Sequence, residues 1–593
     1  MRRYILALAT TLLAATTVSA ETNASLSDLE IRTASRGMLL NRDIMTISDI
    51  GSLSRSSALQ YGSARSMAMA GALTSLGGDA SSMMINPAGL GMAIDSDLTI
   101  TPLVTIQNSK NSAGKYYNDG SNNVAFSNFS TTFNLYESAE TKLVSLNVGL
   151  GYNRVADLNY NYSFASMDNS SSIARLFSRQ LTADGVSLNE LIGSDNPDWS
   201  YLSTNLWGAA LGYKTGLTFQ SKGDIPSGYY NTSAGASSAD NYRESIESAD
   251  DPLWEATWIS DNASVDQYMS VESVGSIGEY DIAFGANVDN KLYVGFTLGI
   301  QSVYQRLDLI YGEEYNNPNS FGSELTEYNE LNYANYNQAI ITRGSGVNVK
   351  IGASYRLDES LRVGVAYHSP TYYSLSREYQ ASMASASTYY NEEVSSSERR
   401  YVSVDSPILE DTEMNRWKFR SPSRLLLGAS YTYNLRALIS IDYECAWYGS
   451  MAMRSIPYGV SPELYDGISD IYKSVNTIRM GGEYKLSPQF ALRGGYSFSG
   501  SMVRDDVSSS ELLDMATTDK ISYYSAGIGW SPNRGVSFDL TYMRQRTKYT
   551  NYTLFYSAES DSIDTPTASS AQSGSFSTRL KQNNIALSMI FRM

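Results

Sequence analysis

Two reactive side chains are almost missing from this 593-residue sequence, which has one cysteine, Cys445, and one histidine, His368. A single cysteine excludes a disulfide framework within the chain, and the two counts together exclude a zinc site built from cysteine and histidine. Any serine–histidine–aspartate catalytic arrangement would have to use His368. No Walker-type phosphate loop is present either. The sequence therefore argues against an enzyme and predicts no metal and no cofactor; nothing in it requires haem.

Long apolar segments are missing as well. After residue 20, no segment is long and apolar enough to form a helix that spans a bilayer. The first residues combine a basic start (Met1-Arg-Arg3), a short apolar run (5–13) and the small residues Val18-Ser-Ala20. This pattern predicts a secretory signal peptide over 1–20; the alternative is a retained N-terminal anchor. Basic residues are outnumbered, 44 against 61 acidic ones, and the net charge of −17 argues against nucleic acid as a partner.

The chain contains many segments in which apolar and polar residues alternate, as they do in β-strands. The last strand, Ile585-Ala-Leu-Ser-Met-Ile-Phe591, places its apolar side chains on one face, and residues 291–301 alternate in the same way. The pattern recurs over the ranges 347–355, 361–368, 424–431, 437–444, 475–486, 489–500, 519–531 and 535–549. A chain that meets lipid without transmembrane helices must satisfy its backbone by closing a sheet on itself. The 45 tyrosines suit such a protein, since tyrosine favours membrane interfaces.

The connections predict which membrane is crossed. Short turns such as Val288-Asp-Asn290 alternate with long polar segments such as 311–338 and 379–413. Outer-membrane barrels have this layout, with short periplasmic turns and long extracellular loops. We therefore expect a multi-pass β-barrel in the outer membrane of a Gram-negative bacterium.

The strand count follows from parity. Counting back from the C-terminus gives 11 strands to about 274–286, and three upstream strands, the third at 143–157, bring the total to 14. The stretch 206–219 is also strand-like, but including it would place the two ends of the barrel on opposite sides of the membrane. We assign it to an excursion, 158–273, outside the wall. The predicted organisation is a signal peptide (1–20), an N-terminal arm and hatch (21–97), and a 14-stranded antiparallel transmembrane β-barrel (98–593).

The segment before the barrel does not alternate like a strand. Residues 58–80 are rich in small side chains, and Asn86-Pro-Ala-Gly-Leu-Gly91 predicts a compact turn. Small residues suit a segment that packs inside a narrow lumen, and the first barrel strand follows near Leu98. An ordinary N-terminal soluble subdomain is the alternative.

Here the sequence resembles the FadL/TodX family of outer-membrane transporters for hydrophobic compounds. The resemblance is carried by these segments: Tyr61-Gly-Ser-Ala-Arg65, Ala70-Gly-Ala72, Gly78-Asp-Ala80, Asn86-Pro-Ala88, Val365-Ala-Tyr-His-Ser-Pro370, Ser421-Pro-Ser-Arg424 with the strand to Tyr431, and Arg493-Gly-Gly-Tyr496. It implies an N-terminal hatch inside the lumen, with Asn86, Pro87, Ala88 and Gly89 as hatch residues. It also implies passive uptake of hydrophobic or amphipathic small molecules, such as long-chain fatty acids or aromatic hydrocarbons.

The resemblance further implies that ligands can leave sideways through a kinked third strand. In this chain that strand is 143–157, where Gly149, Gly151 and Asn153 are compatible with a kink or bulge. Barrel packing is an equally good explanation for the two glycines. About 37 residues, from Glu21 to Ser57, precede the matching hatch region, and they predict an added arm.

Alternation also places charged side chains in the lumen. Arg362, Arg424 and Arg493 are candidate polar anchors, since an arginine can hold a carboxylate by paired hydrogen bonds. The plainer alternative is an interior ion-pair network that stiffens the barrel. Both predict inward-facing arginines with acidic neighbours such as Asp442 and Glu444.

Other functions remain open at this point. A structural or adhesive surface barrel would use its long acidic loops to bind partners, an outer-membrane hydrolase would need His368, and a general porin would have no need of a plug. The expected partners are a hydrophobic small-molecule substrate, outer-membrane lipid and the barrel-assembly machinery during insertion. Closure of the wall makes a monomer sufficient.

Overall fold

A computed structural model describes the chain over most of its length. It covers the following residues: 35–36, 45, 47–56, 61–111, 120–169, 171–183, 185–187, 191, 199, 202, 206–220, 254–256, 264–316, 329–391, 396–409, 416–456, 468–505, 520–547, 550–557, 571–572 and 575–593. The expected signal peptide (1–20), most of the arm (21–57) and the first residues of the expected hatch, 58–60, lie outside these ranges.

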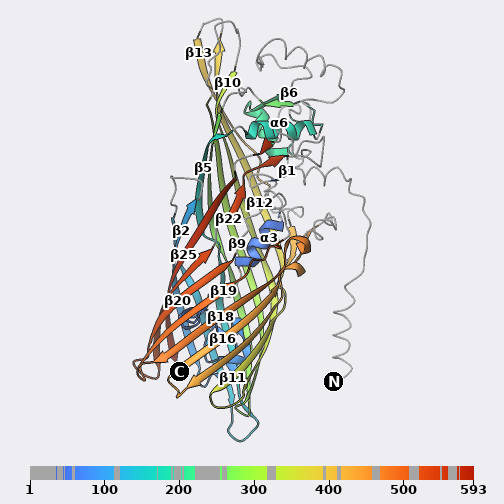
Figure 1. The fold of residues 1–593 in the computed structure, drawn as a ribbon. Helices are drawn as coiled ribbons and strands as arrows, with labels where there is room; N and C mark the ends of the chain where they lie inside the picture. Colours follow the sequence, from blue (N-terminus) through green and yellow to red (C-terminus); the bar gives the residue numbers. More distant parts are fainter. Residues whose placement is uncertain are drawn as a thin grey trace, which may run out of the picture.

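The described strands form a closed antiparallel barrel of 14 wall strands (Figure 1). Its labelled segments are β2 (Asp97–Asn111), β3 (Gly120–Glu137), β4 (Leu143–Asp157), β5 (Tyr160–Asn169), β8 (Ser264–Val288), β9 (Leu292–Asn316), β10 (Asn329–Arg356), β11 (Leu361–His368), β12 (Tyr372–Asn391), β13 (Ser396–Asp405), β14 (Arg416–Arg420), β15 (Arg424–Tyr433), β16 (Ala437–Trp447), β17 (Ala452–Ile456), β18 (Ser474–Lys485), β19 (Phe490–Ser499), β20 (Ile521–Trp530), β21 (Val536–Thr547), β22 (Thr550–Thr553) and β25 (Ser575–Arg592). Several wall strands consist of segments in succession: β4–β5, β11–β12, β13–β14–β15, β16–β17 and β21–β22. The barrel closes where β2 pairs with β25.

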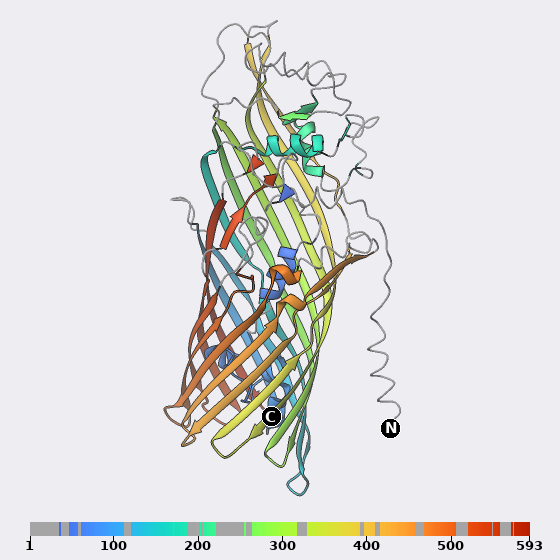
Figure 2. The ribbon, with the colours of Figure 1, turned by 45° about the vertical axis from the view of Figure 1, so that its right-hand side comes forward.

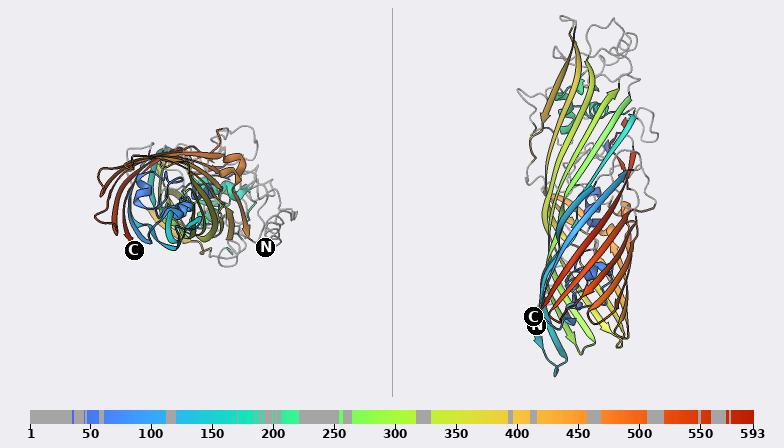
Figure 3. Two further views of the ribbon diagram at one scale, coloured as in Figure 1. Left: turned by 90° about the horizontal axis from the view of Figure 1, so that it is seen from below. Right: turned by 90° about the vertical axis from the view of Figure 1, so that its left-hand side faces the viewer.

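Most of the remaining elements lie inside the barrel or beyond its loop end, and η4 connects the wall segments β16 and β17 (Figures 1 and 2). They are α3 (Ile47–Ser56), α4 (Ala64–Ala68), α5 (Ser82–Ile85), the 3-10 helices η1 (Pro87–Met92) and η4 (Tyr448–Ser450), α6 (Ile173–Ala183), α8 (Trp207–Lys214), β6 (Thr218–Gln220), β7 (Trp254–Ala256), β1 (Ser35–Arg36), β23 (Tyr556–Ser557) and β24 (Ala571–Gln572). Seen along the barrel axis, the helical segments of the N-terminal region lie within the ring of strands (Figure 3). No helix of the described residues is long and apolar enough to cross a membrane.

The wall has an apolar outer face and a polar inner face. Outward side chains on neighbouring strands include Ile282, Phe296 and Ile351, all exposed, while the residues between them point into a closely packed lumen. Tight turns join the strands at the end where the C-terminus lies. Two of these turns use backbone with positive φ, at Asp289-Asn290 and at Asn434-Leu435, which fits two-residue hairpins.

The wall is much taller on one side than on the other. Strands β8 and β9 have 25 residues each and β10 has 28, whereas β18 to β21 have 10 to 12. About 9–11 tilted residues suffice to cross a bilayer. The long strands therefore continue well past the membrane, and α6 and α8 pack against their upper parts through an apolar cluster that includes Phe177, Leu211 and Tyr336.

Residues 206–219 lie outside the wall, as the parity argument predicts, although they are not strand-like throughout: they contain helix α8, and β6 pairs only with β7 among the described strands. One expectation about the loops changes. The excursion is shorter than 158–273, because Tyr160–Asn169 (β5) and the first half of β8 pair with each other as extensions of the wall. Likewise, parts of 311–338 and 379–413 are paired strands. Their polar, serine- and tyrosine-rich composition lacks the alternation that marks a lipid-facing strand.

Candidate functional site

A segment from Tyr61 to Ala93, which we call the luminal segment, lies against the inner face of the wall. It contains α4, α5 and η1, and nearly all of its residues are buried. A ring of wall glycines faces it: Gly149, Gly285, Gly295, Gly352, Gly364, Gly428, Gly481, Gly495 and Gly527. A side chain at Gly495 would place Cβ 2.5 Å from the backbone carbon of Met69, so only glycine allows this close approach.

Wall side chains satisfy the backbone of the luminal segment. Asp442 Oδ2 accepts from the Thr74 N–H at 2.7 Å, and Asn147 Nδ2 donates to the Leu90 carbonyl at 2.6 Å. The segment has little regular structure, so these bonds replace the partners that a helix or sheet would supply. The result is a segment held to the wall mainly at its polar backbone groups.

Asn86 organises the turn that the sequence singled out. Its Oδ1 accepts from the Ala88 N–H at 3.1 Å and caps η1, with Pro87 in the first helical position. Its Nδ2 donates to the Thr74 carbonyl at 2.6 Å, which ties two parts of the luminal segment together. Gly89 packs against Ser82 and its carbonyl accepts from the Gly78 N–H at 3.2 Å. The predicted hatch residues thus lie together at the wall.

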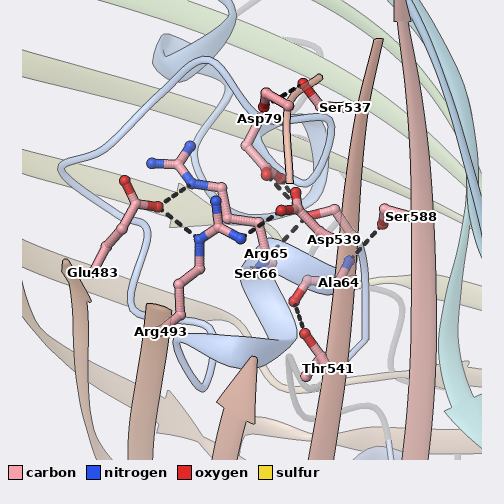
Figure 4. A network of polar contacts seen from close by, with 12 residues as sticks. Ala64, Arg65, Ser66, Asp79, Glu483, Arg493, Ser537, Asp539, Thr541 and Ser588 are labelled. Carbon is pink, nitrogen blue, oxygen red and sulfur yellow. Dashed lines mark hydrogen bonds and ion pairs between the residues drawn. The ribbon is translucent and has the colours of Figure 1, made fainter. Parts of the chain in front are cut away.

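A charged network holds the other end of the luminal segment (Figure 4). Arg65 of α4 and Arg493 of β19 both bind Glu483 Oε2, at 3.1 and 2.7 Å, and Arg493 also binds Asp539 at 2.5 Å. Beside them, Thr541 Oγ1 donates to the Ala64 carbonyl at 2.6 Å. Arg493 therefore contacts two carboxylates of the wall.

Above the luminal segment lies a small polar cavity of about 50 Å³. It is lined by Ser54, Met84, Val155, Glu279, Gln301, Asn348, Lys350, His368, Ser369, Thr371, Tyr373, Ser421, Pro422 and Arg424. Two lining atoms, Ser54 Oγ and Asn348 Oδ1, have no hydrogen-bond partner within the described part of the protein. A ligand headgroup or ordered water would satisfy them.

A second, apolar cavity adjoins the polar one and shares Ser54 and Tyr373 with it. It holds about 10 Å³ and is lined by Leu53, Ser54, Ile277, Val303, Tyr373, Leu375 and Phe419. Helix α3 forms its roof and is fixed to the wall, since Arg377 binds Asp49 at 2.9 Å and Arg55 donates to Ser499 Oγ at 2.9 Å. The two cavities together form an amphipathic site between α3 and the luminal segment.

Charged residues of the polar cavity are paired. Lys350 binds Glu279 and also Asp281, the latter at 3.1 Å. Arg424 lies 3.6 Å from Glu444, a long separation, whereas Arg479 binds the other oxygen of Glu444 at 2.5 Å. Glu444 thus keeps a close partner without Arg424. Of the two cations that line the cavity, Lys350 and Arg424, Arg424 has the looser ion pair with the wall.

His368 contacts the luminal segment. Its Nε2 lies 2.8 Å from the Ile85 carbonyl, and the ring is buried. This bond makes the imidazole a support for the turn before Asn86. A side chain so engaged is poorly placed to act as a catalytic base.

The third wall strand is regularly paired with both neighbours at Gly149, Gly151 and Asn153, the residues expected to form a kink, and a bulge lies just beyond them. Gly149 and Gly151 face Met83 of α5, and Asn153 donates to Asp281 at 2.8 Å and accepts from Asn128 at 2.7 Å. Above the pair Asn128–Asn153, β3 has its described pairing with β2 alone, and β5 has its pairing with β8 alone. The bulge between Arg154 and Ala156 lies directly above that last pair, where the separation begins.

The structure separates the three predicted anchors. Arg424 lines the polar cavity; Arg362 lies lower, with Nη1 3.5 Å from Met92 Sδ; Arg493 belongs to the network of Figure 4. Sequence reasoning missed Glu279 and Asp281, although they alternate with the apolar Tyr280 and Ile282 and could have been recognised as inward-facing. It also missed α3, for which no alternation signal exists.

The model of the family described as outer membrane protein transport protein (OMPP1/FadL/TodX) matches residues 264–581, more than half of the chain. No curated protein sequence matches.

Similar solved structures include three bacterial outer-membrane proteins. The toluene transporter TodX of Pseudomonas putida is 13% identical, with 90% of this chain and 99% of that chain covered and a TM-score of 0.46. The toluene transporter TbuX of Ralstonia pickettii is 13% identical, with coverage of 90% and 99% and a TM-score of 0.42. A FadL homologue of Pseudomonas aeruginosa is 10% identical, with coverage of 90% and 98% and a TM-score of 0.44. The family assignment is based on the family match alone, which covers more than half of the chain. The chain belongs to the OMPP1/FadL/TodX family of outer-membrane transport proteins, and it is a passive transporter of hydrophobic molecules, not an enzyme.

Proposed function

We propose that this protein takes up amphipathic small molecules, such as long-chain fatty acids, and accepts aromatic hydrocarbons as smaller ligands. The observation that carries the proposal is the pair of adjoining cavities between α3 and the luminal segment, one polar and one apolar. An amphipathic ligand would place its carboxylate in the polar part and its chain against Ile277, Leu375 and Phe419.

Arg424 is the proposed anchor for the carboxylate. When Arg424 turns from Glu444 toward a ligand, Glu444 keeps its closer partner Arg479. The movement therefore leaves no buried carboxylate unpaired. Paired hydrogen bonds from the guanidinium would then fix the headgroup. Lys350 is less suited, because Glu279 and Asp281 would both lose their cation.

Gating follows from the small size of the cavities. Together they hold far less than the roughly 300–1,000 Å³ of an ordinary ligand pocket. A ligand can therefore bind only when α3 or the luminal segment moves. We propose that α3 closes the site toward the loops and that the luminal segment acts as the hatch toward the periplasm, each with at least two arrangements.

A lateral route is the proposed way out of the site. Val155, which lines the polar cavity, lies in the bulge between Arg154 and Ala156. The described strands β3 and β5 have no ladder between them above this point. A hydrophobic ligand leaving here would enter lipid and avoid water, which is the favourable direction for apolar surface.

One chain suffices for this mechanism. Insertion by the barrel-assembly machinery and function as a monomer belong to the proposal, because the described wall strands of a single chain close into one barrel.

The test is uptake of labelled fatty acids and toluene by cells that produce the full chain or matched variants. Arg424→Gln should raise the half-saturation concentration for a fatty acid roughly 10- to 100-fold, the loss expected for a charge-assisted pair, and leave toluene uptake unchanged. The control Arg493→Gln removes an inward arginine of a neighbouring ion-pair network that does not line the cavity.

The route is tested separately. Val155→Trp should reduce uptake of both ligands, whereas Val148→Trp, on the same strand but outside the cavity lining, should not. Equal effects of Arg424→Gln and Arg493→Gln would refute the anchor. The full chain and a variant that lacks residues 58–97 could both show no more uptake than barrel-free cells, for every ligand. That result would refute transport and favour a surface barrel that binds partners through its loops.

A further inference from the structure

A cluster of basic side chains lies on the outer face of the wall, where β2, β25 and β21 run side by side. Arg544 and Arg546 project from β21, Lys581 and Arg579 from β25, and Lys110 from β2. The register places Arg546 directly opposite Lys581, and Lys110 directly opposite Arg579. We call these five residues the basic patch.

The patch has a fixed height relative to the membrane. In the rows below it, toward the short turns, lie outward apolar side chains such as Ile528, Leu540 and Leu587, which face lipid. Tyr542 and Tyr524 follow in the next rows, both about half exposed. Apolar residues, then tyrosines, then bases is the order expected on crossing from the hydrocarbon layer into the headgroup layer. The patch is on the side of the long loops and therefore meets the outer leaflet.

Four of the five charges of the patch have no acidic partner on the described wall. No described ion pair involves Lys110, Arg544, Arg546 or Lys581, and the charges that act on the Lys581 ammonium are those of Lys110, Arg579, Arg544 and Arg546. Like charges directly opposite each other destabilise a strand pair. These like charges face each other although the chain has a net charge of −17 and many acidic side chains.

Acidic residues are few in the surrounding wall: β2 contains only Asp97, at the opposite end of the strand from Lys110. The sequences of β19, β20 and β25 contain no aspartate or glutamate, and Asp539, the one in β21, is buried in the lumen beside Arg493. A shallow hollow of about 460 Å³ lies in the middle of the patch, lined by Tyr524, Tyr542, Arg544, Arg546 and Lys581. It has room for a phosphate group with the sugar or glycerol that carries it.

We propose that the basic patch binds the phosphorylated headgroup of an outer-leaflet lipid. Arg544 and Arg546 can hold phosphate oxygens by paired hydrogen bonds, and Lys581 adds a point charge between them. The tyrosines rest against the carbohydrate or glycerol part, and the acyl chains lie along Leu540, Ile585 and Val104 below. The bound anion removes the repulsion between Arg546 and Lys581, so the lipid also stabilises this side of the barrel.

The experiment measures lipid retention by the purified full-length protein in detergent, using native mass spectrometry. The probe is lipid A with two phosphates, compared with lipid A from which the phosphates have been removed. The triple variant Arg544→Gln, Arg546→Gln, Lys581→Gln should bind the bisphosphorylated probe roughly 100-fold more weakly, since each basic side chain near an anionic surface contributes about fivefold.

The control variant makes the same charge change elsewhere. Lys142→Gln, Lys485→Gln, Arg534→Gln neutralises three exposed bases at the short turns and should bind like the unaltered protein. Heat-modifiable migration on gels shows that each variant forms a barrel. Equal binding of the two probes, equal loss in both triple variants, or displacement of the lipid by inorganic phosphate alone would each overturn the proposal, the last because it would indicate a site for a soluble anion.

Discussion

The guanidinium of Arg377 lies 2.9 Å from the carboxylate of Asp49, and this buried ion pair joins strand β12 of the wall to helix α3 in the lumen. The Arg377 side chain is 3% exposed, so the pair is shielded from solvent. It connects α3 to the wall by a direct charge contact.

Arg377→Gln should release α3, because removing one partner of a buried pair costs about 3–5 kcal/mol. We expect faster hydrogen exchange in residues 47–56 and a higher rate of ligand uptake. Arg343→Gln is the matched control, since its pair with Glu378 is on the exposed face of neighbouring strands and is worth about 1 kcal/mol at most. Unchanged hydrogen exchange in α3 would show that the Arg377–Asp49 pair does not fix this helix to the wall.

A side chain at Gly495 should displace the luminal segment. Gly495→Val puts Cβ against the Met69 backbone, whereas Gly494→Val, one residue earlier, meets no atom closer than 3.9 Å. The first variant should make residues 61–93 accessible to protease and let small solutes leak into liposomes; the second should do neither. Equal behaviour of both variants would show that the close contact at this ring is dispensable.

Asn86 offers a test of how the hatch turn is held. Asn86→Ala removes both the cap on Ala88 and the bond to the Thr74 carbonyl, which should cost about 1–3 kcal/mol of local stability. Asn86→Asp keeps the oxygen that caps η1 but loses the donor to Thr74. Hydrogen exchange of residues 74–92 should rank the unaltered protein slowest and the alanine variant fastest; equal rates in all three would contradict the assigned roles.

Docking of α6 against the wall should depend on pH through Glu313. Its carboxylate accepts from Tyr311 and Tyr315 at 2.5 Å, from Ser172 at 2.7 Å and from the Ile173 N–H at 2.8 Å, at the start of α6. Burial raises the pKa of Glu313, while these donors oppose the rise. Because the pKa is higher in the docked state, docking is strongest below the ordinary glutamate pKa and weakens as the pH rises through the raised value.

The measurement is hydrogen exchange of residues 173–183 at acidic and neutral pH, corrected for intrinsic rates. Glu313→Gln, which carries no charge at either pH, should abolish the dependence on pH. The neighbouring Glu314→Gln changes an exposed side chain and should leave it intact. Persistence of the dependence in Glu313→Gln would assign it to another group.

The membrane-spanning wall could be predicted from the sequence because lipid imposes a period of two on every strand. That period placed Arg424 and Glu444 inside and Ile439 and Ile441 outside, as the structure has them. Above the membrane the constraint ends. Strand β12, with residues such as Ser382, Ser385 and Ser387, carries no such signal, although its backbone pairs over its whole length.

The interior of the site was harder to predict for a different reason. The contact of Lys350 with Glu279 and Asp281 depends on β10 lying two strands from β8, which follows from the register of three strands and not from any local pattern. Helix α3 was hidden because its apolar residues are few: Ile47, Ile50 and Leu53 at helical spacing are compatible with many exposed helices. The glycines of the ring were visible, but they gain meaning only when the luminal segment is seen beside them.

That ring also determines what an empty barrel would be like. Where the luminal segment now lies, the wall presents the hydrogen atoms of Gly149, Gly352, Gly495 and their neighbours, and no side chain reaches inward from these positions to fill the space. A barrel that lost the segment would therefore be widest at the level where it is now closed. In a planar bilayer such a pore would carry a large, steady ionic current, and the narrowest point for ions would move up to the layer of Lys350, Arg424 and Glu444, whose charges would then set its ion selectivity.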